Sequence, residues 1–171
     1  MRRSAKAAIL LSLVVLMSSP RPAVSGSATT PSLHPVTAPL LGSWLLDTSR
    51  LPMPPEQRPK SVRITFGKTE GGMLNVHVDI VYASGEEVHS FSRAPLDGTP
   101  AAVTNSPEGD AVALKQPTPS VLVMALRKGD VLVSTRIYSV LPGGHNLVET
   151  VVYPKKFESF VMKTNYFTRI R

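Results

Sequence analysis

The stretch that decides the fold is Leu40-Leu41-Gly42-Ser43-Trp44-Leu45-Leu46-Asp47. It holds the only tryptophan of the chain and opens the first segment that can form a β-strand. Gly42 has no side chain, so another part of the backbone can pass close to it. The indole of Trp44 can then close one end of whatever the sheet encloses. Because the segments that follow also have strand patterns, we expect this strand to start the sheet.

Downstream of this stretch, apolar and polar residues alternate with the period of two that is typical of half-buried strands. In residues 60–67, for example, Val62, Ile64 and Phe66 share one face. Glycine-containing turns such as Gly71-Gly72 and Ser84-Gly85 separate the segments. The pattern predicts about ten strands, near residues 40–47, 60–67, 73–82, 87–93, 101–104, 111–115, 121–127, 131–140, 146–153 and 159–169.

Tight turns between successive strands indicate an all-β fold with an antiparallel up-and-down meander. An open sheet of this size would leave edges exposed, so the meander must curl closed or split into a sandwich. The long connections that a Greek key requires are missing from the pattern. We therefore expect closure into a barrel of eight to ten strands.

A proline-rich segment interrupts the pattern between the first two strands. Residues 52–59 contain four prolines, which disfavour both a helix and a central strand. We expect residues 49–59 to form a long ordered loop, a candidate lid over one end of the barrel.

The N-terminal region has the three parts of a secretory signal. Arg2, Arg3 and Lys6 precede an apolar run over residues 7–17, which is shorter than the ~20 residues that span a bilayer. Small residues follow, and they place the cleavage site between Ser25 and Ala28. We expect a signal peptide over residues 1–25, a flexible Pro/Ser/Thr-rich tether over 26–39 and a single domain over 40–171. The mature protein is then secreted or periplasmic, without a membrane span.

Composition narrows the function further. Four of the nineteen Lys and Arg residues precede Ser25, whereas all twelve Asp and Glu residues follow it, so the mature chain carries a net charge of only +3. This charge is compatible with ordinary solubility, and the few aromatic residues are not interleaved with basic ones. We therefore expect no nucleic acid as partner. With no cysteine, the fold must be stabilised by burial and closed hydrogen bonding rather than by disulfides.

The order of short motifs resembles that of lipocalins, the wider calycin group and, more closely, lipocalin-like exported bacterial proteins of uncharacterised function. The resemblance covers roughly residues 40–171. The motifs are a Gly-x-Trp-x-Leu opening, a Pro-x-Ser-Val segment, an Asp-Gly turn and a basic residue that ends the last strand. They correspond here to residues 42–46, Pro59-Lys60-Ser61-Val62, Asp97-Gly98 and Arg169.

The resemblance implies a barrel closed at one end by Gly42, Trp44 and Arg169. In calycins a basic side chain from the last strand crosses the first-strand tryptophan, so Arg169 or Arg171 is expected over Trp44. Such a cation–π contact contributes about 0.5–2 kcal/mol. The chain departs from lipocalins proper because it lacks their cysteines and C-terminal helix. It also lacks the helical lid of fatty-acid-binding proteins.

The apolar faces of the strands either line a cavity or fill the barrel, and the sequence leaves both alternatives open. The residues expected to face inward, and to line any cavity, are Ile64, Phe66, Val76, Val78, Ile80, Leu122, Met124, Leu126, Val133, Ile137, Phe160, Met162 and Tyr166.

Two groups of polar residues could form a binding or catalytic site. Arg136-Ile137-Tyr138 is similar to the Arg-x-Tyr pair that holds a carboxylate in fatty-acid-binding barrels, although there it lies on the final strand. If Arg136 faced inward, Val133 and Ile137 would face outward, so we expect Arg136 to face solvent. His77, Asp79 and His89 lie on adjacent strands, and we expect surface positions rather than a metal or acid–base site.

These patterns favour a binding protein over an enzyme. No Gly-x-Ser-x-Gly, His-Glu-x-x-His or phosphate-binding loop occurs in the sequence. We expect a monomeric, non-catalytic protein without metal or cofactor that binds or carries a small hydrophobic molecule. The alternative is a structural or protein-interaction module with a filled barrel and no ligand.

Overall fold

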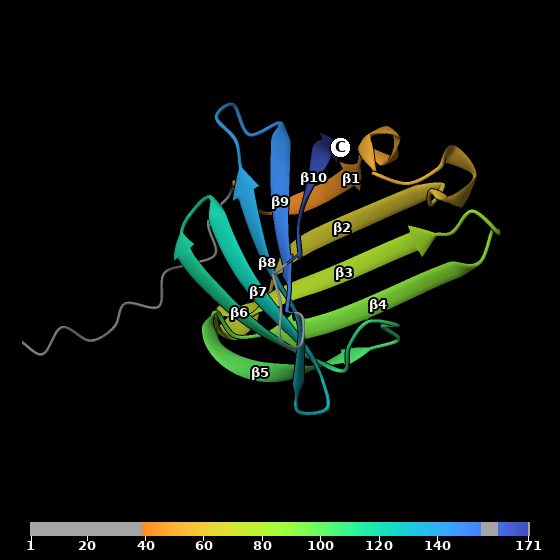
Figure 1. Ribbon diagram of the computed structural model, residues 1–171. Helices are drawn as coiled ribbons and strands as arrows, with labels where there is room; N and C mark the ends of the chain where they lie inside the picture. Colours follow the sequence, from red (N-terminus) through yellow and green to blue (C-terminus); the bar gives the residue numbers. More distant parts are fainter. Residues whose placement is uncertain (1–38, 155–160, 171) are drawn as a thin grey trace, which may run out of the picture. The chain divides into compact units, whose positions relative to one another are not determined.

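The computed structural model describes residues 39–154 and 161–170. All ten expected strands are present and form one closed antiparallel barrel in meander order, in which the first strand pairs with the last (Figure 1). The strands are β1 (Gly42–Leu46), β2 (Ser61–Lys68), β3 (Leu74–Val81), β4 (Glu87–Ala94), β5 (Asp97–Thr104), β6 (Ala111–Thr118), β7 (Val121–Lys128), β8 (Val131–Val140), β9 (Asn146–Tyr153) and β10 (Val161–Ile170). The expected signal peptide and, apart from Pro39, the expected tether lie outside the described residues, as do Phe160 and Arg171.

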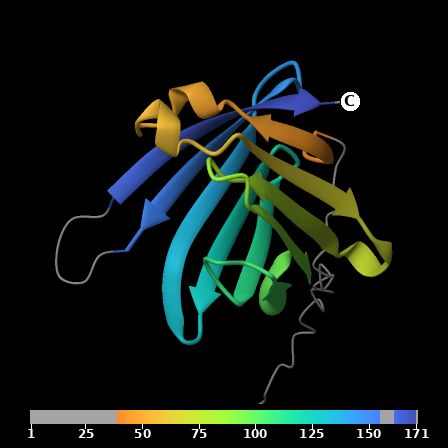
Figure 2. The ribbon, with the colours of Figure 1, turned by 90° about the vertical axis from the view of Figure 1, so that its right-hand side faces the viewer.

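The closure depends on the stretch that opens the domain. Strand β1 pairs with β2 on one side and with β10 on the other, and Trp44 lies opposite both Ile64 and Arg169 in the register. Figure 2 shows the strands curving around a common axis. Because β1 has a partner on each side, the meander has no free edge there, which removes a route to aggregation.

Two strands are longer than the pattern predicts, and both contain a proline. Strand β5 begins at Asp97 rather than near residue 101, and β6 continues past Pro117 to Thr118. The register shifts between Asp97 and Pro100, and again between Lys115 and Thr118. Such irregularities accommodate a residue that has no N–H to donate to its neighbour. The sequence rule that proline ends a strand therefore fails at these two places.

The connections are short, apart from the proline-rich one. Residues between β1 and β2 contain two 3₁₀ turns, η1 (Thr48–Arg50) and η2 (Pro55–Gln57), and a third, η3 (Glu70–Gly72), joins β2 to β3. Asp47 caps η1 by accepting hydrogen bonds from the backbone N–H and the hydroxyl of Ser49. The long segment is thus ordered, as expected.

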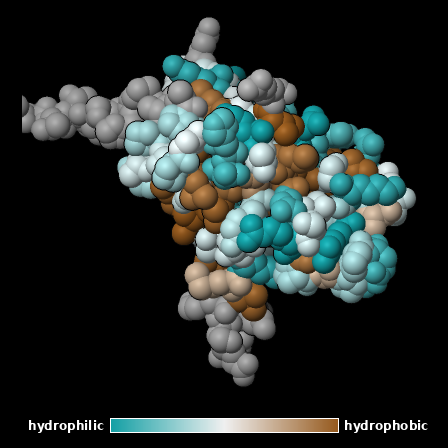
Figure 3. Space-filling view, turned by 90° about the horizontal axis from the view of Figure 1, so that it is seen from above, coloured by the Kyte–Doolittle hydropathy of each residue, from teal (hydrophilic) through white to brown (hydrophobic). Residues whose placement is uncertain are grey.

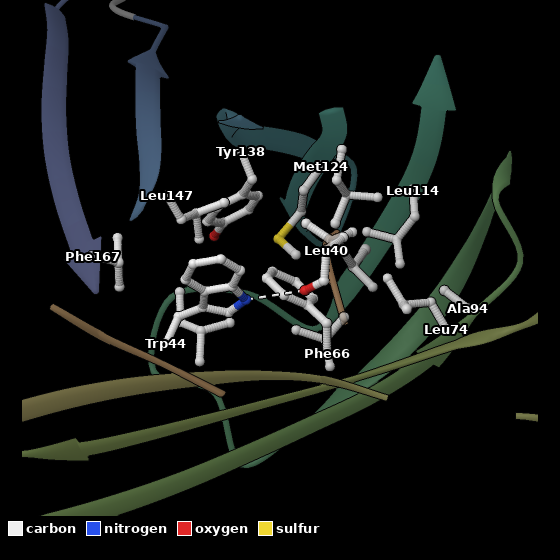
Figure 4. Close-up of a cluster of buried hydrophobic side chains, with 14 of the residues drawn as sticks. Leu40, Trp44, Phe66, Leu74, Ala94, Leu114, Met124, Tyr138, Leu147 and Phe167 are labelled. Atoms are coloured by element: carbon white, nitrogen blue, oxygen red, sulfur yellow. Dashed lines mark hydrogen bonds between the residues drawn. The ribbon is translucent and has the colours of Figure 1, made fainter. Parts of the chain in front are cut away.

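One half of the barrel is filled with apolar side chains. Figure 4 shows these side chains pointing toward one another, with the Trp44 Nε1–H donating a hydrogen bond to the Leu40 carbonyl at 3.0 Å. The rings of Phe66 and Tyr138 meet edge to face, with centroids 5.4 Å apart, an arrangement that aromatic pairs prefer. The buried residues at this end are Leu40, Trp44, Phe66, Leu74, Ala94, Leu114, Leu122 and Leu147.

The face of the molecule that is seen from above carries both hydrophobic and hydrophilic residues (Figure 3). Seen from above, hydrophobic residues show near the middle of the face, and hydrophilic residues surround them over much of it (Figure 3). In the described part of the chain, no helix has the length and apolar character needed to cross a membrane.

A cavity in one half of the barrel

The other half of the barrel encloses a cavity of about 210 Å³. Most of its wall is apolar and comes from strands on both sides of the barrel. The apolar residues that line it are Leu46, Val62, Ile64, Val76, Val78, Ile80, Phe91, Val103, Pro107, Val112, Met124, Leu126 and Phe167. The barrel therefore combines the two alternatives that the sequence left open, because it is filled at one end and hollow at the other.

The residues expected to face inward divide into three groups. Ile64, Val76, Val78, Ile80, Met124 and Leu126 line the cavity. Phe66 and Leu122 are buried in the filled half, so they face inward without lining the cavity. Val133, Ile137, Met162 and Tyr166 do neither.

The inward orientation expected for residues of β8 and β10 is wrong. On β8 the interior positions are Ser134, Arg136 and Tyr138, which places Val133 and Ile137 on the outer face. Both strands carry apolar residues on both faces, so alternation alone does not choose the inner one.

On β10 the interior positions are Asn165 and Phe167. Met162 is 66% exposed, and the Tyr166 ring lies under the Arg50 guanidinium, with 3.3 Å between Cζ and the ring centroid. The inner face of β10 is thus the face that was expected to lie outside, and it carries the polar residue Asn165.

Arg136 points into the cavity, contrary to the expectation that it faces solvent. Its side chain is 16% exposed, and its guanidinium forms ion pairs with Glu149 and Glu108. The Nη1–Oε1 distance to Glu149 is 3.3 Å, and Nε donates to the Ser134 hydroxyl at 3.4 Å. An unpaired arginine in this position would be costly, and the two carboxylates remove that cost.

Glu149 on β9 is the most buried of the three charged residues, at 2% exposure. Its Oε1 accepts from Arg136, and its Oε2 accepts from the Asn165 side-chain amide on β10 at 2.7 Å. Both oxygens thus accept from donors on the two strands that flank β9. The cavity has a charged wall made by β8, β9 and β10, in addition to its apolar walls.

Electrostatic interactions in this wall shift the pKa of two of its groups. Burial raises the pKa of the Tyr138 hydroxyl well above its usual range, and the negative charge of Glu149 raises it further. Burial by itself lowers the pKa of Arg136, but its electrostatic interactions with Tyr138, Glu149 and Glu108 outweigh this effect, and the pKa is raised. Arg136 is therefore a permanent cation and Tyr138 a neutral hydroxyl.

The connection between β5 and β6 supplies the third charged residue. Ser106, Pro107 and Glu108 line the cavity, and the Glu108 side chain is about half exposed, so it lies where the cavity meets solvent. A Cβ on Gly109 would lie 2.5 Å from the Arg127 carbonyl oxygen and 2.7 Å from Leu126, so only glycine fits there. None of residues 49–59 lines the cavity, so the covering segment is this connection rather than the proline-rich loop.

The closed end carries the contact that the family resemblance implies. The Arg169 guanidinium lies over the Trp44 indole, with Cζ 4.0 Å from the ring centroid. Gly42 has a φ of +114°, and a Cβ there would lie 2.8 Å from Arg169 Nη1. Glycine at this position therefore permits both the backbone conformation and the close approach of the arginine.

The histidine grouping lies on the outside of the barrel. His89 and Asp79 are cross-strand partners, and 2.7 Å separates Nδ1 from Oδ1. The hydrogen bond with Asp79 raises the pKa of His89. His77 instead stacks on Phe91, with ring centroids 4.7 Å apart. No group of three potential metal-binding side chains occurs among the described residues.

Sequence reasoning missed Glu108, Glu149 and Asn165. A signal for Glu149 existed, because it stands in phase with Leu147 and Val151 in an otherwise apolar row. A charged residue on such a face needs a partner, and Arg136 was the available cation.

Comparisons with models of protein families, with curated proteins and with solved structures found no match for this chain. The class of protein therefore follows from the fold and the cavity alone. It is a closed ten-stranded antiparallel β-barrel, consistent with a calycin-like fold, with an internal cavity that has apolar walls and one charged wall.

Proposed function

We propose that this protein is an exported, non-catalytic, lipocalin-like barrel that binds or carries a small, largely apolar molecule. The observation that carries the proposal is the cavity, because apolar walls with a few convergent polar groups are typical of small-molecule sites. The charged groups of its wall are bonded to one another, an arrangement that suits a binding site.

The size of the cavity limits the ligand. The cavity has a volume of about 210 Å³. This volume suits a single ring with a short side chain better than a long fatty acid. A cavity of about 150 Å³ in another protein binds benzene, which shows that the scale is adequate for an aromatic ligand.

Binding is tested with a fluorescent apolar probe and the mature, purified protein. We expect fluorescence to rise on mixing and a small apolar competitor to reverse the rise. Native mass spectrometry after mild purification shows whether a molecule co-purifies. If the probe does not respond and nothing co-purifies, the alternative of a structural or interaction module without ligand is favoured.

A pair of matched variants locates the binding site. Val78→Phe adds a ring inside the cavity, whereas Val133→Phe makes the same change on the outer face of β8. We expect the first variant to reduce probe binding at least about tenfold, the effect of 1.4 kcal/mol of lost binding free energy. The second variant should bind normally. Equal binding by both would place the probe outside the barrel.

Export is a separate part of the proposal, and the N-terminal sequence supports it. Expression of the full chain in a bacterium, followed by fractionation, should place the protein in the periplasm or medium. Mass spectrometry should show a mature N-terminus between residues 26 and 29. A protein that stays in the cytoplasm at full length would contradict export and leave the binding proposal intact.

A further inference from the structure

The charged wall of the cavity has an excess of negative charge. Among the described residues that line the cavity, Arg136 is the one Lys or Arg, whereas Glu108 and Glu149 are both acidic. Both carboxylates pair with the same guanidinium. The three groups together therefore carry a net charge of −1.

The charge of Arg136 is already neutralised by two carboxylates. Its Nε donates to Ser134, its Nη1 to Glu149 and its Nη2 to Glu108, so three of its five N–H groups already have partners. A ligand carboxylate would have to displace one of these groups or lie beside it as a third negative charge. Glu149 is 2% exposed, so water screens this repulsion poorly.

The acidic side chains, in contrast, can accept further hydrogen bonds. An ionised carboxylate offers about four acceptor positions. Glu149 accepts two of the hydrogen bonds described here, one on each oxygen, and Glu108 accepts one on Oε2. An ammonium group brings three donors and no acceptor, which matches this arrangement.

We propose that the cavity selects a small cationic amine, an apolar body with one protonated nitrogen directed at Glu108 and Glu149, and that it rejects carboxylates. This inference rests on the proposed function and specifies the ligand class. It differs from the carboxylate binding that the Arg-x-Tyr resemblance implies, because here the arginine is already neutralised. The apolar walls would hold the body of the ligand, and the size of the cavity would limit it to about one ring.

The test compares three probes of similar shape and different charge: 2-phenylethylamine as the cation, 2-phenylethanol as the neutral compound and phenylacetate as the anion. Their dissociation constants are measured by calorimetry on the mature protein near neutral pH. We expect the amine to bind roughly ten- to a hundredfold more tightly than the alcohol, the range for a hydrogen bond to a charged group. Phenylacetate should bind more weakly than the alcohol.

A charge-neutralising variant tests which group is responsible. Glu108→Gln keeps the shape of a half-exposed side chain and brings the net charge of the cluster to zero. We expect the preference for amine over alcohol to fall at least about fivefold, which corresponds to 1 kcal/mol. Glu56→Gln removes the same charge from an exposed 3₁₀ turn outside the cavity, and it should leave the preference unchanged.

The outcomes separate the two proposals. If the alcohol or phenylacetate binds at least as tightly as the amine, the cationic selectivity is overturned and the cavity remains a ligand site. If none of the three binds and the fluorescent probe is also silent, the proposed function fails and the ligand class fails with it. The comparison on the unmodified protein decides the question even if a variant does not fold.

Discussion

Arg169 joins three parts of the closed end through a single guanidinium. It donates to the carbonyl oxygens of Gly144, Leu41 and Pro39, at 2.7, 2.5 and 2.5 Å, and it covers the Trp44 ring. Hydrogen bonds from a charged donor are stronger than neutral ones. The residue therefore fixes the indole from outside, while apolar neighbours hold it from inside.

Trp44→Ala should destabilise the protein by about 3–5 kcal/mol, the usual cost of removing a buried aromatic side chain. The ring is fully buried, and its loss also leaves the Leu40 carbonyl without its donor. The free energy of unfolding is measured by chemical denaturation. Leu45→Ala, a 37% exposed position on the outer face of the same strand, should cost less than about 1 kcal/mol. A similarly small cost for Trp44→Ala would show that the indole does not close the barrel.

Arg136→Leu should destabilise the protein by about 3–5 kcal/mol, because it leaves the Glu149 carboxylate buried without its cation. The double variant Arg136→Leu/Glu149→Leu should recover most of this loss, since it removes both charges and fills their space with apolar atoms. Denaturation curves of both variants check the prediction. A double variant no more stable than Arg136→Leu would contradict it.

At the scale of single elements, the connection between β5 and β6 covers the cavity, a role that the sequence predicted for the proline-rich loop. It enters the cavity wall because Gly109 packs directly against β7, whereas the loop over residues 49–59 packs elsewhere. Asn105 begins this connection with a φ of 54°, a left-handed conformation that asparagine tolerates. The local backbone geometry thus directs Glu108 toward Arg136.

Gly109→Ala should push this connection away from β7, because the new methyl group would overlap the Arg127 carbonyl and Leu126. We expect a loss of about 1–3 kcal/mol, as for other overpacked sites, together with weaker probe binding. Gly67→Ala is a suitable control, since its Cβ would meet Asn75 at an ordinary 3.7 Å. Hydrogen exchange of residues 105–110 should increase in the first variant only, and unchanged exchange in both would contradict the prediction.

The strands themselves were predictable, and the inner face of two of them was not. Alternation located β2 and β3 with the right face inward, because one face of each is clearly more apolar, and on β7, which is apolar on both faces, the face with the larger leucine and methionine side chains is the inner one. It failed on β8 and β10, where the interior positions Arg136 and Asn165 are polar. Sequence rules assume that polar means exposed, and a charged wall inside a barrel violates that assumption. The residues of the charged wall come from four separate segments of the chain, so the pattern within any one strand does not predict that they meet.

At the scale of the whole molecule, the barrel is both a packed core and a container. Closure was predictable from the meander and the exposed edges it would otherwise leave. The division into a filled and a hollow half depends on side-chain volumes around the ring. Trp44 and Phe66 occupy one end, whereas valines and serines line much of the other.

Stability should decrease at alkaline pH because of Tyr138. Its pKa is raised in the folded barrel, so the folded state retains a proton that the unfolded state releases near its usual pKa of about 10. The stabilisation is fully present below this pH and is lost progressively above it. Unfolding free energies measured between about pH 8 and 11 should fall less steeply for Tyr138→Phe. Equal slopes for both proteins would contradict the prediction.

The seam between β1 and β10 has a consequence for biogenesis. The partner that Trp44 needs is 125 positions further along the chain, at Arg169, so a ribosome must make all ten strands before the barrel can close. Until then the nascent sheet has two unpaired edges and an exposed apolar face, the condition in which chaperones bind incompletely folded chains. Because the barrel closes only when β10 pairs with β1, the sheet stays open until that strand has been synthesised.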